Sequence, residues 1–149
     1  MKTLKKRNKI SGVGLHSGEN TSVRLMPSER AGIWFANKAG ELSNVTEAVV
    51  EEDQRLTGFS LPNRVTVRTG EHMLAAIAGM ELDAVEIFLE GGEVPIMDGS
   101  AFPFAEAINE TGYAEAPGET TKRSLAVPIA LEENGGKRFL RQFRRKSSA

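Results

Sequence analysis

The feature of this 149-residue chain that most constrains its fold is an abrupt change of hydrophobic period at Thr69 and Gly70. Before it, Arg64–Arg68 alternates polar and apolar residues, as a half-buried strand does. After it, apolar residues recur at the three- and four-residue spacing of a helix with one buried stripe, made by Met73, Leu74, Ile77 and Ala78. Thr69 is predicted to cap this helix and Gly79 to end it. The chain therefore mixes strands and helices.

Glu71 and His72 stand at the start of this predicted helix. A carboxylate beside an imidazole at such a junction can present a general base and a metal ligand to one water molecule. A catalytic zinc normally takes three protein ligands, whereas the chain has one other histidine, His16, and no cysteine. Two interpretations stay open on these residues alone. Either the remaining ligands lie outside this chain, or Glu71 only compensates the helix dipole and His72 is a surface side chain.

Further strands and a second helix are predicted on both sides of this junction. Short turn-rich connections between the early strands predict antiparallel pairing near the N-terminus. The second helix is expected to end at Gly112. The predicted strands are Ile10–His16, Thr21–Met26, Ile33–Phe35, Val45–Val50 and Ala84–Glu90, and the predicted helix runs from about Phe102 to Glu110.

Composition favours a soluble globular protein. Apolar residues make up 40% of the chain and charged residues 26%, which is ordinary for such proteins. No apolar run approaches the ~18–20 residues that cross a bilayer, and the first residues lack the apolar stretch of a secretory signal. The absence of cysteine is compatible with a reducing compartment. We therefore predict a cytoplasmic location and no transmembrane segment.

Charge is divided unevenly along the chain. Both ends are basic, and all 20 acidic residues lie between them. Basic ends can contact nucleic acid or anionic lipid, but no nucleic-acid-reading motif or aromatic platform accompanies them. We predict solvated tails and no nucleic-acid partner. The basic residues at the ends are Lys2, Lys5, Lys6, Arg7 and Lys9, then Lys137, Arg138, Arg141, Arg144, Arg145 and Lys146.

Three segments, taken in order, carry a family resemblance: Gly12-Val-Gly-Leu-His-Ser-Gly18, Thr69-Gly-Glu-His-Met-Leu-Ala-Ala-Ile77 and Glu93-Val-Pro-Ile-Met-Asp-Gly-Ser-Ala101. Together they closely resemble the N-terminal half of bacterial UDP-3-O-acyl-N-acetylglucosamine deacetylase, a zinc-dependent amidase of lipid A biosynthesis. The resemblance covers residues 3 to about 136. That family consists of two similar α+β domains with the active site in the cleft between them.

The resemblance implies an α+β fold for this chain, a two-layer sandwich in which a mostly antiparallel sheet packs against helices. Residues 1–120 would form the first domain. Residues 121–136 would supply the first strand of a truncated second domain, running from Leu125 to about Glu132, with a turn at 134–136. Residues 137–149 would form a basic tail in place of the return strand.

The resemblance also implies roles for individual residues. Glu71 matches the general base that takes a proton from the attacking water, and His72 matches the one zinc ligand of the first domain. Leu15 matches a residue that lines the acyl-chain passage, and His16 would lie next to the catalytic cleft and its substrate. The family's other two zinc ligands, its oxyanion-stabilising lysine and its general-acid histidine lie in the second domain and have no counterpart here. Zn²⁺ is thus the implied cofactor, with one ligand in this chain.

Several candidate residues also have structural explanations. For His16, a hydrogen-bonded histidine at a strand end is an equal alternative. Asp98, before Gly99 and Ser100, is interpreted as turn and cap chemistry. Gly12, Gly14 and Gly18 lack the strand–loop–helix context and the Lys-Ser/Thr ending of a phosphate loop, so that function is rejected.

Two functions remain. The first is a partial zinc-dependent deacetylase acting on UDP-3-O-acyl-N-acetylglucosamine, which would need a complementary second-domain chain and be inert alone. The second is a repurposed or truncated first domain that serves as a binding module. Because the family's first domain packs against its second, we also expect this chain to expose an apolar face and to self-associate.

Overall fold

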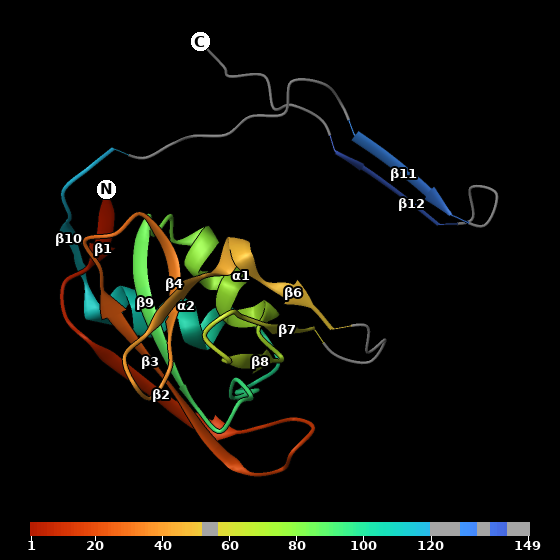
Figure 1. Ribbon diagram of the computed structural model, residues 1–149, viewed down its shortest axis with the longest axis horizontal. Coiled ribbons are helices and arrows are strands. Elements are labelled where there is room, and N and C mark those ends of the chain that lie inside the picture. The colour runs from red at the N-terminus through yellow and green to blue at the C-terminus, as the bar shows by residue number, and fades with distance from the viewer. Residues whose placement is uncertain (52–56, 120–128, 134–137, 143–149) are drawn as a thin grey trace.

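The computed structural model describes residues 1–51, 57–119, 129–133 and 138–142 (Figure 1). Its main element is a seven-stranded mixed sheet. Strand β9 is the centre of this sheet, because it pairs with β3 in antiparallel fashion and with β4 and β1 in parallel fashion. The strands are β1 (Lys2–Leu4), β2 (Asn8–Val13), β3 (Asn20–Pro27), β4 (Gly32–Ala36), β5 (Leu42–Asn44), β9 (Ala84–Glu90) and β10 (Tyr113–Glu115).

The edges of the main sheet are formed by antiparallel pairs. At one edge β2 pairs with β3, with Ile10 opposite Val23, which confirms the antiparallel pairing predicted near the N-terminus. Elsewhere β1 pairs with β10, and β5 pairs with β4. For β3 and β4 the predicted antiparallel pairing is wrong, because β4 does not pair with β3 and lies parallel to β9 instead.

A smaller three-stranded antiparallel sheet leads into the first helix. It consists of β6 (Val49–Val50), β7 (Gly58–Ser60) and β8 (Thr66–Arg68). Phe59 of β7 meets Phe35 of β4 edge to face, with ring centroids 5.6 Å apart. A three-stranded sheet needs a packed hydrophobic face to be stable, so this aromatic contact helps to fix β7, and through it β8, against the main sheet.

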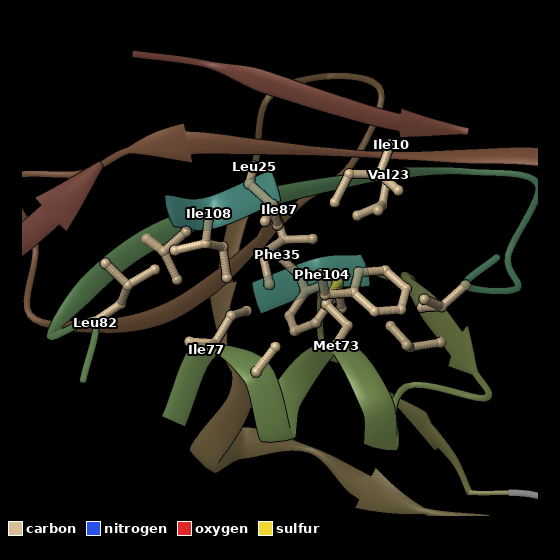
Figure 2. Close-up of a cluster of buried hydrophobic side chains, with 14 of the residues drawn as sticks. Ile10, Val23, Leu25, Phe35, Met73, Ile77, Leu82, Ile87, Phe104 and Ile108 are labelled. Atoms are coloured by element: carbon tan, nitrogen blue, oxygen red, sulfur yellow. The ribbon is translucent and has the colours of Figure 1, made fainter. Parts of the chain in front are cut away.

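Two helices, α1 (Glu71–Gly79) and α2 (Phe102–Thr111), pack together against one face of the main sheet (Figure 1). Their apolar side chains meet those of the strands in one core, drawn in Figure 2. Leu25 of β3 and Ile87 of β9 lie directly opposite each other and are fully buried. Each such side chain contributes about 1.5–3 kcal/mol. The helices supply Met73, Ile77, Phe104 and Ile108 to this core.

The predicted α+β class, a two-layer arrangement of a mostly antiparallel sheet and helices, is confirmed. Strand β9 has its predicted bounds, and α1 and α2 end at Gly79 and at Thr111, before Gly112. Within the described residues, neither helix is long and apolar enough to cross a membrane.

Three predicted strands are corrected. The strand predicted at Ile10–His16 runs from Asn8 to Val13, and Leu15 and His16 lie in the turn that follows it. Val45–Val50 is not one strand: Val45–Glu47 forms a 3₁₀ turn, and only Val49 and Val50 are extended. Asn44 and Glu47 form a capping box that starts this turn, which is why the backbone leaves the extended region. The strand predicted at 64–68 begins at Thr66, because Arg64 adopts a left-handed conformation (φ 65°).

Near the C-terminus β11 (Ile129–Glu133) pairs with β12 (Arg138–Gln142) in antiparallel fashion. The sequence predicted a strand here, but a basic tail in place of the return strand. That second prediction is wrong for residues 138–142, which form β12. The predicted turn at 134–136 and the predicted strand start at Leu125 lie outside the described residues. The division of the chain at residue 120 stays a prediction.

Candidate functional site

Helix α1 presents Glu71 and His72 in its first turn. Strand β8 ends at Arg68, and Gly70 already has helical dihedral angles (φ −83°, ψ −12°). Glu71 is exposed and His72 is half-buried, so solvent reaches both side chains. The Glu71 carboxylate lies at the positive end of the helix dipole, where a negative charge is favoured. The structure thus places the predicted base and the predicted metal ligand at consecutive positions of a solvent-accessible helix start.

Thr69 does not cap this helix, contrary to the prediction from sequence. No side chain caps the first turn of α1, and the Thr69 hydroxyl donates to the Glu93 carboxylate instead, at 3.0 Å. Thr69 is buried and has a left-handed backbone (φ 54°). That conformation is a genuine outlier for a β-branched residue and costs on the order of 1–3 kcal/mol. The chain therefore turns from β8 into α1 through a strained, buried residue.

Glu93 is the hub of a polar junction, a name used here for Gly14, His16, Ser17, Thr69 and Glu93. Its side chain is buried. The backbone N–H of His16 donates to one carboxylate oxygen at 2.9 Å, and the N–H of Ser17 donates to the other at 3.0 Å. The Thr69 hydroxyl completes the set on the first oxygen. One carboxylate thus joins the loop after β2 to the residue that precedes the helix start.

The main chain at Glu93 connects the same segments. Val94 donates its N–H to the Arg68 carbonyl at 2.9 Å, and Arg68 donates its N–H to the Gly92 carbonyl at 3.0 Å. The Thr21 hydroxyl donates to the Glu93 carbonyl at 2.7 Å. The junction is therefore held by backbone ladders as well as by the carboxylate.

The pKa of the Glu93 carboxyl is about 2, below its ordinary value of 4.5. Burial, the largest single influence, acts to raise this pKa. It is outweighed by hydrogen bonds from the N–H groups of His16 and Ser17 and from the side chains of Ser17 and Thr69. Glu93 is therefore a buried negative charge at neutral pH, stabilised by neutral donors.

Gly14 has a structural reason to be glycine. A Cβ atom at this position would collide with the Glu93 carboxylate and the Ser17 hydroxyl. Its N–H donates to the Glu19 carbonyl, and its own carbonyl accepts from Gly18, so the loop closes on itself. The glycines of this segment, which loosely resembled a phosphate loop, therefore include one that makes room for a carboxylate.

Leu15 and His16 lie on this loop and both side chains are exposed. His16 takes part in the junction through its backbone N–H, while its imidazole faces solvent. The Val13 carbonyl accepts the N–H of Ile96 at 3.0 Å, which brings the loop beside the segment after Glu93. Exposed apolar side chains of Val13, Leu15 and Met97 therefore belong to two neighbouring segments.

Asp98 has the turn role predicted from sequence. Its carboxylate accepts the N–H of Ser100 at 2.9 Å and the Ser100 hydroxyl at 2.8 Å, and Ser100 in turn accepts from the N–H of Phe102 at the start of α2. The Ser100 hydrogen bonds lower the pKa of Asp98, and the charge of His72 lowers it further. Asp98 therefore also lies within electrostatic range of His72.

The sequence interpretation missed Glu93, and it missed the hydrogen bond from the Thr69 hydroxyl to the Glu93 carboxylate. Glu93 opens the third segment of the family resemblance, yet nothing local marks it, because its partners lie 24, 76 and 77 residues away. The sequence signal for Glu93 is a carboxylate directly after two glycines and before an apolar run, Val94–Ile96.

The described residues carry an incomplete set of zinc donors. Among them, no three His, Cys, Asp or Glu side chains gather as a metal-binding group. His72 offers one imidazole, whereas a catalytic zinc takes three protein ligands. On their own, the described residues therefore do not fit a catalytic zinc, and further donors would have to complete the site.

Comparison with known proteins agrees with the three segments. Residues 1–143 match the family described as LpxC: UDP-3-O-acyl N-acetylglycosamine deacetylase. Relatives named UDP-3-O-acyl-N-acetylglucosamine deacetylase include one from Lawsonia intracellularis, 35% identical over 93% of this chain and 46% of the relative. Another, from Legionella pneumophila strain Corby, is 37% identical over 90% of this chain and 45% of the relative. A third, from Myxococcus xanthus, is 41% identical over 87% of this chain and 42% of the relative.

The chain spans somewhat less than half the length of these relatives. Its matched part nevertheless runs through the loop that carries Leu15 and His16, through the helix start and through Glu93. The family resemblance predicted from sequence is confirmed. The chain belongs to the UDP-3-O-acyl N-acetylglycosamine deacetylase family.

Proposed function

We propose that this chain supplies one part of a zinc-dependent hydrolase site that removes the 2-acetyl group of UDP-3-O-acyl-N-acetylglucosamine in lipid A biosynthesis. In this proposal Glu71 is the general base that accepts a proton from the attacking water. His72 supplies one donor to the zinc ion. The observation that carries the proposal is the open helix start, where an exposed carboxylate and an imidazole stand together within the region of the family match.

The chemistry suits the two residues. A general base must reach its water molecule without displacing other protein groups, and Glu71 is exposed at the end of a helix whose body is fixed by buried residues. Holding the pair on a packed helix limits its motion, which positioned catalysis requires. The family relatives are named for this deacetylation.

Leu15 and His16 are assigned to the substrate side of the site. The exposed apolar group of Val13, Leu15 and Met97 offers a surface to an acyl chain, whose burial is favourable in proportion to its apolar area. His16, on the same loop, is available to the polar part of the substrate. We place the reaction in the cytoplasm, in line with a composition free of cysteine.

The 149-residue polypeptide by itself is proposed to be inert. A single imidazole holds zinc weakly, whereas catalysis requires a fixed ion with three protein ligands. A complementary polypeptide carrying the second-domain donors is the expected partner. Acetate release and zinc content of the purified chain test this: we expect no turnover and less than one tightly bound zinc per chain. Turnover that Glu71→Gln abolishes, together with one zinc per chain, would refute it.

The roles of the pair are tested in a chimera that joins residues 1–119 to the second half of the Legionella pneumophila relative. Glu71→Gln should lower kcat by about 100-fold or more while zinc stays bound, because a general base contributes about 10²–10⁴. His72→Ala should remove the zinc. Glu106→Gln, an exposed carboxylate on α2, is the matched control and should leave both unchanged. An active chimera that is insensitive to Glu71→Gln would contradict the assignment.

A further inference from the structure

The polar junction contains a buried charge that neither the core nor the proposed reaction requires. Neither of the two ion pairs among the described residues includes Glu93; both involve Glu90, three residues earlier. The partners of Glu93 are two backbone N–H groups and the hydroxyls of Thr69 and Ser17. Burying a carboxylate without a cation is costly. The place of Glu93 in the fold must therefore explain why a carboxylate is buried there.

A carboxylate fits this position better than the neutral side chain of the same shape. Ionised, it has only acceptor sites, and here it receives donors on both oxygens. A glutamine would present an NH₂ group to one of those donors. The donors come from two segments far apart in sequence, so a neutral replacement, which loses one of these hydrogen bonds, would weaken the connection between the segments.

Thr69 shows what the hydrogen bonds hold. Its left-handed backbone (φ 54°) is unfavourable for a β-branched side chain, and strain of this kind persists only where the surroundings over-determine it. The hydroxyl bond to Glu93 and the backbone bonds at Arg68 and Val94 are those surroundings. Because Gly70 and Glu71 follow directly, the angle at Thr69 sets the direction in which the helix leaves β8.

We propose that Glu93 is a positioning residue: its carboxylate locks the Leu15–His16 loop against the left-handed Thr69 and so fixes where Glu71 and His72 stand. Glu93 acts on the first helical turn because its partner Thr69 is joined to that turn through Gly70. It acts on the substrate side because the N–H groups of His16 and Ser17 donate to it. The functional meaning of this lock rests on the proposed function, but the lock itself is defined by geometry and is tested without substrate or metal.

The test compares four variants of the ¹⁵N-labelled 149-residue chain. Glu93→Gln removes the charge. Thr69→Val removes the hydroxyl and keeps the shape, and Thr69→Ser keeps the hydroxyl. Glu90→Gln is the matched control, an exposed carboxylate of the adjoining strand bonded to Ser22, Lys9 and Arg24. Amide resonance positions and hydrogen exchange are measured at residues 14–17 and 69–73, with unfolding in urea measured in parallel.

Glu93→Gln should speed exchange at the His16 and Ser17 amides by about tenfold or more beyond the change caused by global stability, since hydrogen bonds to charged groups are the stronger ones. It should also shift the amide resonances of Gly70, Glu71 and His72. Thr69→Val should shift the same three, Thr69→Ser should restore them, and Glu90→Gln should leave them in place.

The proposal is overturned if Glu93→Gln moves only His16 and Ser17 while residues 70–72 stay as in Glu90→Gln. It is also overturned if Thr69→Val and Thr69→Ser give the same spectrum. If Glu93→Gln does not fold, the two Thr69 variants still decide the outcome. Failure of the deacetylase proposal would appear as a chimera insensitive to Glu71→Gln, and would leave these resonances as they are.

Discussion

The core beneath α1 and the polar junction at its first turn hold the same helix by different means. In the core, Met73 and Ile77 are buried among apolar residues of the sheet and of α2 (Figure 2). At the junction, a strained threonine and a buried carboxylate fix the chain by directed hydrogen bonds. The core determines that the helix is present, whereas the junction determines the angle at which it begins. Stability and placement are thus assigned to neighbouring but distinct regions.

The largest expected effect removes a side chain from the core. Phe104→Ala should lower the free energy of unfolding by about 3–5 kcal/mol, because it deletes a fully buried ring and leaves a cavity. Urea unfolding at neutral pH measures it. Any change at the His16 and Ser17 amides should follow global unfolding alone. If Phe104→Ala keeps its stability but loses protection from hydrogen exchange at the His16 and Ser17 amides, the core and the junction are not separate in function.

The next effect concerns the junction and depends on pH. Since the pKa of Glu93 is lower when folded (about 2) than its ordinary value of 4.5, the native state favours the ionised form. Its contribution, on the order of 3 kcal/mol, is complete above about pH 5 and is lost as the pH falls toward 2. Unfolding in urea across this range should show a steeper decline for the wild type than for Glu93→Gln. If the free energy of unfolding falls equally with pH in the wild type and in Glu93→Gln, the Glu93 carboxylate does not contribute to this pH dependence.

A smaller effect sharpens the comparison at single glycines. Gly14→Ala should lower the free energy of unfolding by about 1–3 kcal/mol, because the new methyl group is forced against the Glu93 carboxylate. Gly79→Ala is the control: apart from its chain neighbours and its own helix backbone, no atom lies within 4 Å of its Cβ position. Alanine there should be neutral or stabilise by up to about 1 kcal/mol. Thermal unfolding of both variants checks this. Equal destabilisation would mean that Gly14 is not a contact site.

The difference between the two regions also explains what could be predicted from sequence. Helix α1, helix α2 and strand β9 follow from hydrophobic periodicity, because burial of one face leaves a repeating local pattern. The junction leaves none, since Glu93 meets His16 and Thr69 only after the sheet has formed. Thr69 was assigned to the nearest helix by local rules and instead bonds across the fold.

The error at 45–50 is of another kind, because a local signal was present. Asn44 followed three residues later by Glu47 is a capping-box pattern, and it indicated a turn where the valines favoured a strand. The sequence and the family resemblance predicted Glu71 and His72 as a pair at a helix start. The structure adds that the turn from β8 through Thr69 positions them. Their roles, and those of Leu15 and His16, stay predictions.

The pairing of β1 with β10 has a consequence for synthesis of the chain. Lys2 lies opposite Glu115, and the Met1 carbonyl accepts the N–H of Ala116 at 2.9 Å. Strand β1 therefore lacks one of its neighbours until residues 113–116 have emerged from the ribosome. Nascent chains stalled before that point should keep β1 open to proteases, and those released after it should acquire protection at both segments together.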